Sequence, residues 1–231
     1  MSEQVKQLFT EIAPRYDQIN SLLSLKIDQL WRRAAIKHLA GDRYRQVLDL
    51  CAGTLAMTQQ LLQVNLDCHV TAVDFSETML QIGLKKLPYG DLARVKIQNA
   101  DAMQLPFPPH SFDGIMCAYG MRNLDDNRRA LEGIFRLLKP GGKLVVLDFF
   151  APDRWASRLF YATYGHFFIP MLGRLLSRHR NAYEYLQRSI QGFYTPVAYA
   201  ELLKLIGFQN VAIKHQTGGI SCLLTAERGN P

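Results

Sequence analysis

The sequence has little that would support a redox, disulfide or metal site. Its four cysteines stand at positions 51, 68, 117 and 222, mostly in apolar stretches, and no two have the spacing of a redox or zinc motif. Its six histidines include no helical pair that flanks a glutamate. We therefore expect reduced cysteines in the core and no metal.

The sequence also lacks a long apolar run. No run approaches the about 20 residues that span a bilayer, and the start, Met1-Ser2-Glu3-Gln4, lacks the charged-then-apolar pattern of a secretion signal. We expect a cytoplasmic protein. With 231 residues and 48% hydrophobic content, the chain is long enough for one domain with a sizeable core.

The formal charge of +7 comes without a long basic tract. Basic residues stand in short clusters, such as Trp31-Arg32-Arg33 and residues 174–180, which are typical of solvated helix faces. No basic stripe interleaved with aromatic residues is present, so nucleic acid is not an expected partner. A sharper alternative is peripheral contact with an anionic membrane, at the inner face, worth about 1 kcal/mol per basic residue near the lipid.

Two apolar runs end in a way that indicates a bound cofactor. Residues 47–50 stop at the turn Cys51-Ala52-Gly53-Thr54, and residues 69–73 stop at Asp74. Such a pattern is typical of a nucleotide-type cofactor between two parallel strands. The turn has one glycine, Gly53, and no cation, whereas a dinucleotide site normally needs three glycines. A ligand without phosphates fits better, and S-adenosylmethionine is the common one.

Apolar runs and helical patterns alternate along the chain, which predicts an α/β fold with a parallel sheet. Strands are expected at residues 46–50, 69–73, 95–98, 114–118, 143–149, 211–214 and 220–226, and helices at 3–23 (interrupted by Pro14), 25–39, 56–64, 76–86, 127–138 and 196–206. Ser76 should cap its helix, and Lys139 should face the end of the preceding one.

We divide the chain into four parts. Residues 1–40 form a helical substrate-side segment, 41–150 the cofactor-binding core, 151–195 an insertion, and 196–231 a helix and strand hairpin that complete the core. The insertion is rich in aromatic residues, which either pack on the sheet edge or overhang the strand ends where ligands bind. We expect a helical aromatic lid.

Four positions follow from the cofactor assignment. Asp49 is placed near the methionine ammonium, Gly53-Thr54 beneath the cofactor, Asp74 on the ribose hydroxyls, and Asp101 beside the adenine amine. An aspartate after a strand also caps helices or turns, so each acid has a structural alternative. The three acids follow three successive strands at about the 25 to 30 residues of a βα unit.

Several segments, which run nearly from end to end of the chain, share a specific pattern. They are Ile12-Ala13-Pro14-Arg15-Tyr16-Asp17, Leu30-Trp31-Arg32-Arg33, Val47 to Thr54, Asp74 to Leu80, Leu105-Pro106-Phe107, Ser111-Phe112-Asp113, Gly120 to Leu124, Arg136 to Gly142 and Thr217-Gly218-Gly219-Ile220. With these segments the chain resembles the ubiquinone/menaquinone biosynthesis C-methyltransferases, which are class I S-adenosylmethionine-dependent methyltransferases. The Ala-Pro-Arg-Tyr-Asp opening, the Arg-Asn pair and the Thr-Gly-Gly-Ile close are its narrower signals.

The resemblance implies a Rossmann-like, mixed seven-stranded sheet with its last strand antiparallel. It also implies a cofactor site at Thr54, Asp74-Phe75, Asp101-Ala102 and the strand end near Ala118. The implied reaction is methylation of a ring carbon of a polyprenylated quinol.

The resemblance further implies residues on the acceptor side. Arg122 would stabilise an oxyanion that develops on the ring, Asn123 would orient it, and Tyr16 would wall the pocket. His166 is a candidate for proton transfer, although a histidine in an apolar stretch more often packs. The alternative for Arg122-Asn123 is a salt-bridged loop.

One position departs from the family pattern Gly-Thr-Gly-Asp. The chain reads Gly53-Thr54-Leu55-Ala56, with leucine at the second turn glycine. If that position has a positive φ, leucine costs about 1 to 2 kcal/mol, and if it touches the cofactor, leucine blocks the methionine end.

Two other kinds of function remain open on these residues. One is a noncatalytic relative that binds apolar ligands or stabilises a biosynthetic complex, for which Leu55 argues. The other is a methyltransferase of secondary metabolism that acts on a soluble aromatic ring. A homodimer is compatible with either. Nucleic-acid modification ranks last.

Overall fold

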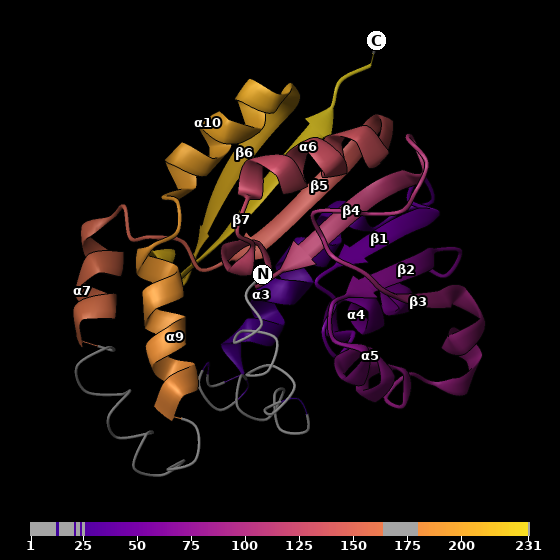
Figure 1. Ribbon diagram of the computed structural model, residues 1–231, viewed down its shortest axis with the longest axis horizontal. Coiled ribbons are helices and arrows are strands. Elements are labelled where there is room, and N and C mark those ends of the chain that lie inside the picture. The colour runs from indigo at the N-terminus through magenta and orange to yellow at the C-terminus, as the bar shows by residue number, and fades with distance from the viewer. Residues whose placement is uncertain (1–12, 14–20, 22–23, 25, 164–179, 231) are drawn as a thin grey trace.

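The computed structural model describes residues 13, 21, 24, 26–163 and 180–230 (Figure 1). Its centre is a seven-stranded sheet in the order β3-β2-β1-β4-β5-β7-β6. The strands are β1 (Gln46–Leu50), β2 (His69–Asp74), β3 (Val95–Asn99), β4 (Phe112–Ala118), β5 (Leu138–Asp148), β6 (Phe208–Gln216) and β7 (Ser221–Arg228). The first five are parallel, and β7 runs antiparallel to β5 and β6. The predicted mixed sheet with an antiparallel last strand is confirmed.

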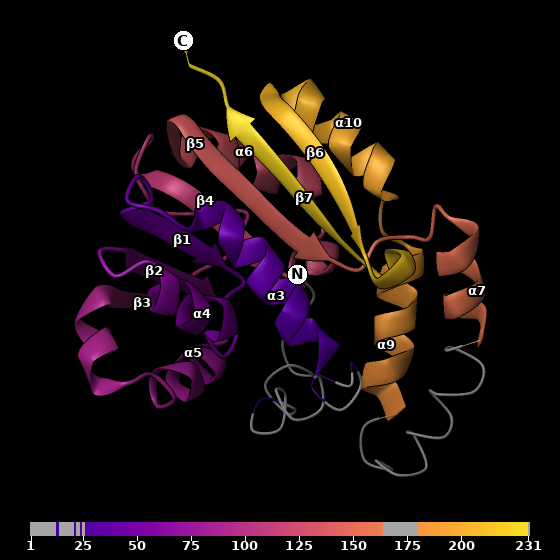
Figure 2. The same ribbon diagram turned by 180° about the vertical axis from the view of Figure 1, so that it is seen from behind.

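Helices cover both faces of the sheet. Figure 2 shows α3 (Ile27–Ile36), α4 (Ala56–Val64) and α5 (Glu77–Leu84) on one face, and Figure 1 shows α6 (Asn127–Leu137) and α10 (Pro196–Ile206) on the other. Two more helices, α7 (Trp155–Thr163) and α9 (Arg180–Gln191), lie together beyond the carboxyl end of β5 (Figure 1). The strand order reverses between β1 and β4, the place where ligands bind in open α/β sheets.

Alternation along the strands produces a core on each face. On β1, Leu48 and Leu50 belong to the cluster beneath α6 and α10, whereas Val47 belongs to the cluster beneath α3, α4 and α5. Successive side chains of a strand point to opposite faces, so one apolar run contributes to both. The core therefore holds the carboxyl ends of β1 and β4 in fixed positions beside each other.

Short polar residues begin the helices. The backbone N–H of Met79 donates to Ser76 at the start of α5, that of Arg129 to Asp126 at α6, and that of Ala198 to Thr195 at α10. The predicted Ser76 cap is confirmed. This cap fixes the chain directly after Asp74, which is a site residue below.

The junction between α6 and β5 differs from the prediction. The strand begins at Leu138, directly after the helix, and carries a register shift opposite residues 112 and 114. Lys139 binds Asp113 with an N–O distance of 2.6 Å and does not cap the helix. Instead Arg228 of β7 donates to the carbonyl oxygens of Phe135 and Arg136 at the helix end, at 2.8 and 3.1 Å. The Pro-Gly-Gly run suggested a turn, but a bulged strand accommodates it.

The cysteines lie within the described ranges of the chain. All four cysteines are free thiols, and Cys68, Cys117 and Cys222 are buried, as predicted for core residues. No helix in these ranges is long and apolar enough to cross a membrane. The helix expected over residues 3–23 falls almost wholly outside the described part of the chain.

Two glycines inside helices form a matched pair for a stability test. A Cβ added at Gly83 in α5 would lie 2.8 Å and 2.9 Å from the backbone C and O of Thr54 and would also overlap the Leu55 side chain. A Cβ added at Gly133 in α6 would meet nothing within 4 Å. We expect Gly83→Ala to lower the free energy of unfolding by about 1–3 kcal/mol, because the backbone must shift. Gly133→Ala should raise it by about 0.5–1 kcal/mol through helix propensity. Urea denaturation of both variants checks this, and a shift of the same sign in both contradicts the packing.

Candidate active site

The turn after β1 carries an unusual amount of left-handed backbone. Cys51, Gly53 and Leu55 have φ of 55°, 53° and 61°. Left-handed backbone costs a non-glycine residue about 1–2 kcal/mol, so the turn stores strain. A Cβ at Gly53 would meet only Met79 Cε, at 3.7 Å, so the backbone there is open to a ligand.

Asp74 joins this turn to the end of β2. Its Oδ2 accepts the backbone N–H of Gly53 and its Oδ1 that of Ser76, both at 2.9 Å. Burial raises the pKa of Asp74, against the effect of these backbone donors. The backbone of Phe75 also hydrogen-bonds this carboxylate, and of its about four acceptor sites these three donors still leave room for a hydrogen bond from a diol.

Asp49 is buried beneath the turn. Its side chain accepts a 2.7 Å hydrogen bond from Thr58 Oγ1 of α4, and the residue is 1% exposed. Burial raises its pKa to about 7, while Thr58 and the charge of Arg32 oppose the shift. Asp49 can therefore be either a protonated acid with a structural role or a carboxylate that pairs with a cationic group of a ligand.

The pKa of Asp49 predicts a pH dependence of stability. The pKa of this carboxyl group rises from its ordinary value of 3.8 in the unfolded chain to about 7 in the folded one, so between these values the folded chain binds more protons. The free energy of unfolding should therefore fall as pH rises from about 4 to about 7, by about 1.4 kcal/mol per unit at most, and then level off. Urea titrations at pH 5 and pH 8 measure the change. Asp49→Asn keeps an acceptor for Thr58 and should lose this part of the slope, and an equal slope in both proteins contradicts the assignment.

Leu55 does not enter the candidate site. The positive φ anticipated for this position is confirmed, but the side chain is 0% exposed and packs among the core residues beneath α5, against Gly83. Of the two effects expected for Leu55, backbone strain is the one present, and burial of the side chain offsets it. The side chain does not line the cleft, so it does not block the methionine end of a cofactor there.

A cleft opens at the carboxyl ends of β1, β2 and β4. Its lining combines predicted residues with residues that sequence reasoning missed: Cys51, Gly53, Asp74, Phe75, Met79, Ala118, Tyr119, Gly120, Asn123 and Leu124. Gly53, Asp74, Phe75, Ala118 and Asn123 were predicted, so five of the expected site residues come together. Gly120 and Leu124 are the ends of the segment Gly120 to Leu124, and the resemblance of that segment was the signal for them.

Four predicted cofactor residues do not line this cleft. Asp49 and Thr54 are buried next to the turn, and Ala102 packs in the core. Asp101 is exposed, and its Oδ1 accepts the N–H of Met103 at 2.9 Å, so the turn-capping alternative is realised. Contact between Asp101 and adenine remains a prediction.

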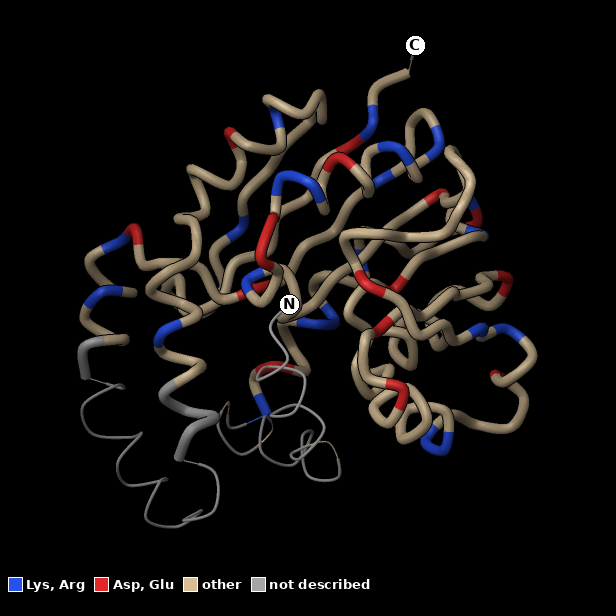
Figure 3. Tube along the Cα trace, in the orientation of Figure 1, with Lys and Arg blue, Asp and Glu red and all other residues tan. Residues whose placement is uncertain are grey.

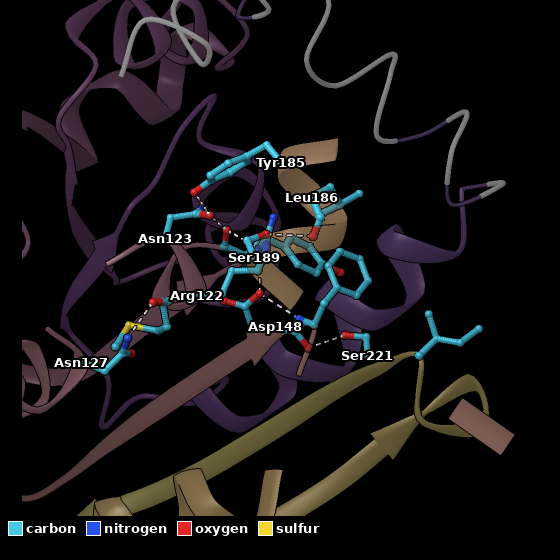
Figure 4. Close-up of polar contacts among 12 residues, drawn as sticks. Arg122, Asn123, Asn127, Asp148, Tyr185, Leu186, Ser189 and Ser221 are labelled. Atoms are coloured by element: carbon cyan, nitrogen blue, oxygen red, sulfur yellow. Dashed lines mark hydrogen bonds and ion pairs between the residues drawn. The ribbon is translucent and has the colours of Figure 1, made fainter. Parts of the chain in front are cut away.

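Arg122 and Asn123 lie in the 3-10 turn Met121–Asn123 that follows β4 (Figure 4). One Arg122 terminal nitrogen is 2.7 Å from Asp148 Oδ1 and donates to the Tyr119 carbonyl at 2.7 Å. The backbone N–H of Arg122 donates to Asp148 Oδ2 at 3.2 Å. Both side chains of the ion pair are buried. The salt-bridged alternative for this loop is therefore realised, and it fixes the turn against the end of β5.

Asn123 connects the cleft to α9. Its Oδ1 accepts the hydroxyl of Tyr185 at 2.9 Å, and its Nδ2 donates to the Tyr119 carbonyl at 3.1 Å (Figure 4). Burial raises the pKa of Tyr185, so this hydroxyl stays protonated and donates. The predicted acceptor-side residues Tyr16 and His166 lie outside the described residues.

Known proteins are similar to this chain over nearly its whole length. The model of the ubiE/COQ5 methyltransferase family matches residues 1–228. The chain belongs to this family. It is 36% identical over 98% of its length to a demethylmenaquinone methyltransferase of Bacteroides fragilis, of which it covers 93%. It is also 36% identical to a ubiquinone/menaquinone biosynthesis C-methyltransferase of Geobacter sulfurreducens, over 98% of this chain and 89% of that one.

Solved structures confirm the class I methyltransferase fold. A human N-acetylserotonin methyltransferase in complex with S-adenosylmethionine has a TM-score of 0.66 at 19% identity, covering 97% of this chain and 60% of its own. A methyltransferase of Aquifex aeolicus has a TM-score of 0.64 at 17% identity, covering 94% and 97%. At such identities the likeness concerns the fold alone.

The chain is thus an S-adenosylmethionine-dependent methyltransferase with a quinone-type substrate. The residues present fit the cofactor: an open glycine turn without cations, and a fixed carboxylate at the end of β2. The alternative of a noncatalytic relative, which rested on Leu55, loses its basis because Leu55 is in the core. Among the described residues, no three His, Cys, Asp or Glu side chains gather as metal ligands would.

Proposed function

We propose that the methyltransferase methylates a ring carbon of a polyprenylated quinol. The observation that carries the proposal is the Arg122-Asn123 turn, in which Asn123 lines the cofactor cleft and accepts a hydrogen bond from Tyr185 of α9. The names of the two relatives, demethylmenaquinone methyltransferase and ubiquinone/menaquinone biosynthesis C-methyltransferase, support the same acceptor class.

Methyl transfer to a ring carbon requires that this carbon be made nucleophilic. S-adenosylmethionine supplies an electrophilic methyl group when bound. A ring carbon becomes nucleophilic enough when a neighbouring hydroxyl has lost its proton, because the anion then delocalises onto that carbon. The carbon later loses its own proton, which restores the aromatic ring. The protein must therefore favour the phenolate and hold it in line with the methyl group.

We assign these tasks to the turn after β4. The positive charge of Arg122 lowers the free energy of the ring anion, and Asp148 fixes the guanidinium while partly offsetting its charge. Asn123, held by Tyr119 and Tyr185, orients the ring oxygen. The resemblance assigns Tyr16, which lies outside the described residues, to the wall of the pocket.

We propose that the segment 151–195 acts as a lid. The part of the cleft that the described residues line encloses about 40 Å³, well below the roughly 300–1,000 Å³ of typical ligand sites, so a bound cofactor needs more space than this part offers. The hydrogen bond between Asn123 and Tyr185 links α9 to one wall. Phe193 and Tyr194 instead pack on Tyr199 of α10, at 5.4 and 5.5 Å between ring centroids, and anchor the end of the segment.

The face of α7 supports peripheral contact with an anionic membrane, where a prenylated acceptor resides. Trp155 and Leu159 are 78% and 56% exposed, and Arg154 and Arg158 are exposed beside them. In the other parts of the chain that the structure describes, Lys and Arg are interspersed with acids (Figure 3). Tryptophan favours the membrane interface, and arginine binds anionic lipid.

Cosedimentation with anionic vesicles should weaken in Leu159→Ala but not in Leu205→Ala, a leucine on α10 that is also exposed. Equal binding by both variants contradicts this surface.

The proposed function is tested with one acceptor in two redox states. The protein is incubated with S-adenosylmethionine bearing a deuterated methyl group and with a short-chain demethylmenaquinone, reduced or oxidised. We expect the label on a ring carbon of the reduced acceptor only, because the oxidised ring has no hydroxyl to ionise. Label on an oxygen, or transfer only to soluble phenols without a prenyl chain, contradicts the proposal.

A further inference from the structure

The Trp31-Arg32-Arg33 segment places a charged group inside the protein that the functions above do not use. Arg32 of α3 is 7% exposed, whereas its neighbour Arg33 is exposed. The Nε of Arg32 lies 3.5 Å from Asp28 Oδ2, one helical turn earlier, and Ser24 Oγ donates to Asp28 Oδ1 at 2.7 Å. Burying a charged pair costs desolvation free energy, which only good geometry and additional hydrogen bonds offset.

Arg32 lies at the edge of the cofactor cleft. Its guanidinium carbon is 4.9 Å from the centroid of the Tyr119 ring, and Tyr119 lines the cleft. Tyr119 stacks on Phe149 with centroids 4.9 Å apart, and the guanidinium of Arg122 lies 5.5 Å from the Phe149 centroid. A column of two rings thus joins Arg32 to the acceptor-side arginine, with the cleft beside it.

Arg32 also acts on Asp49. The charge of Arg32 is among the influences that lower the pKa of that acid, so the two groups are close in electrostatic terms. Asp49 lies near the carboxyl end of β1, and Figure 2 shows α3 across the sheet face with its N-terminal end near the carboxyl ends of the strands. Asp49, which is buried next to the turn at Gly53, therefore has a base within electrostatic reach, and both groups lie beside the cleft that this turn lines.

The donors of Arg32 are not exhausted by these contacts. A guanidinium has five N–H groups in a planar fork that suits a carboxylate. Within the ranges that the structure describes, Asp28 is the acid paired with Arg32, and it engages the Nε. The terminal nitrogens keep donors for a second carboxylate.

We propose that Arg32 binds the carboxylate of the methionyl end of S-adenosylmethionine, while Asp49 takes the ammonium. The inference rests on the proposed placement of the cofactor in this cleft. A zwitterion matches an acid and a base set apart in a buried site, where opposite charges attract more strongly than in water. Asp28 and Ser24 act as positioning residues that hold the fork toward the cleft.

The test compares two ligands that differ in the amino-acid end. Titration calorimetry measures Kd for S-adenosylmethionine and for 5′-methylthioadenosine, which lacks both carboxylate and ammonium. We expect Arg32→Gln to weaken S-adenosylmethionine binding by about 10- to 100-fold and methylthioadenosine binding by less than about twofold. Arg32→Lys should recover part of the affinity, and Arg33→Ala, the matched exposed control, should change neither Kd.

Four results would overturn the inference. Unchanged S-adenosylmethionine affinity in Arg32→Gln removes Arg32 from the carboxylate site. Equal weakening of both ligands indicates a structural effect of the buried pair. A wild-type protein that binds both ligands equally tightly shows that the amino-acid end makes no productive contact. A wild-type protein that binds neither ligand removes the cleft itself, and with it the proposed function.

Discussion

Asp74→Ala should weaken S-adenosylmethionine binding at least about 100-fold while the chain stays folded. The carboxylate is the one acid that lines the cleft as the described residues form it, and the N–H groups of Gly53 and Ser76 hold it in place. Loss of two charge-assisted hydrogen bonds to the ribose accounts for an effect of this size. Calorimetry measures the affinity, and circular dichroism checks the fold.

A neighbouring acid supplies the control for this change. Glu77 follows Asp74 by three positions but is exposed, and its carboxylate accepts a hydrogen bond from Gln81. Glu77→Ala should leave the affinity for S-adenosylmethionine unchanged. If Asp74→Ala binds S-adenosylmethionine as tightly as the wild-type protein does, the ribose assignment is wrong.

Arg122→Ala should lower the rate of methylation about 100-fold or more and also destabilise the fold. The substitution leaves the buried carboxylate of Asp148 without its cation, and breaking such a pair costs about 3–5 kcal/mol. It also removes the charge that favours the ring anion, worth about 100-fold or more in kcat. Turnover at low temperature and urea denaturation measure the two effects.

A double substitution separates the two roles of Arg122. Arg122→Gln combined with Asp148→Asn removes both charges, so no buried ion is left unpaired and most of the stability should return. Methylation should stay slow, with S-adenosylmethionine binding retained. If the double variant regains turnover, Arg122 only holds the turn, and another group must stabilise the acceptor anion.

Most of the fold could be predicted because nearby residues, through their apolar patterns and helix caps, specify its strands and helices. The bounds of β1 and α4 match the expected ranges, and the Ser76 cap follows from its hydroxyl and the acid behind it. The early start of β5 at Leu138 could not be predicted, because the bulge depends on pairing with Phe112. Sequence shows a proline and two glycines there, and those residues suit a turn as well.

The sequence predicted those site residues whose place follows from their position at the end of a strand. It did not predict the contacts that depend on a partner far away in the sequence. Asp74 and Gly53 reach the cleft because each stands at the end of a strand of the parallel sheet or directly beyond it. The pairing of Arg122 with Asp148 depends on two separate strand ends, and no local pattern specifies it. The positive φ of Leu55 could be anticipated, but the direction of its side chain depends on the gap above Gly83.

We expect the cleft beside Gly53 to bind S-adenosylmethionine although a leucine, Leu55, stands two residues further along the turn. Calorimetric titration of the wild-type protein and of Leu55→Gly with S-adenosylmethionine tests it most directly. We expect binding by the wild-type protein and no tighter binding by the variant, because Leu55 lies in the core and not in the cleft. A wild-type protein that gives no heat, together with binding restored in Leu55→Gly, would contradict the account.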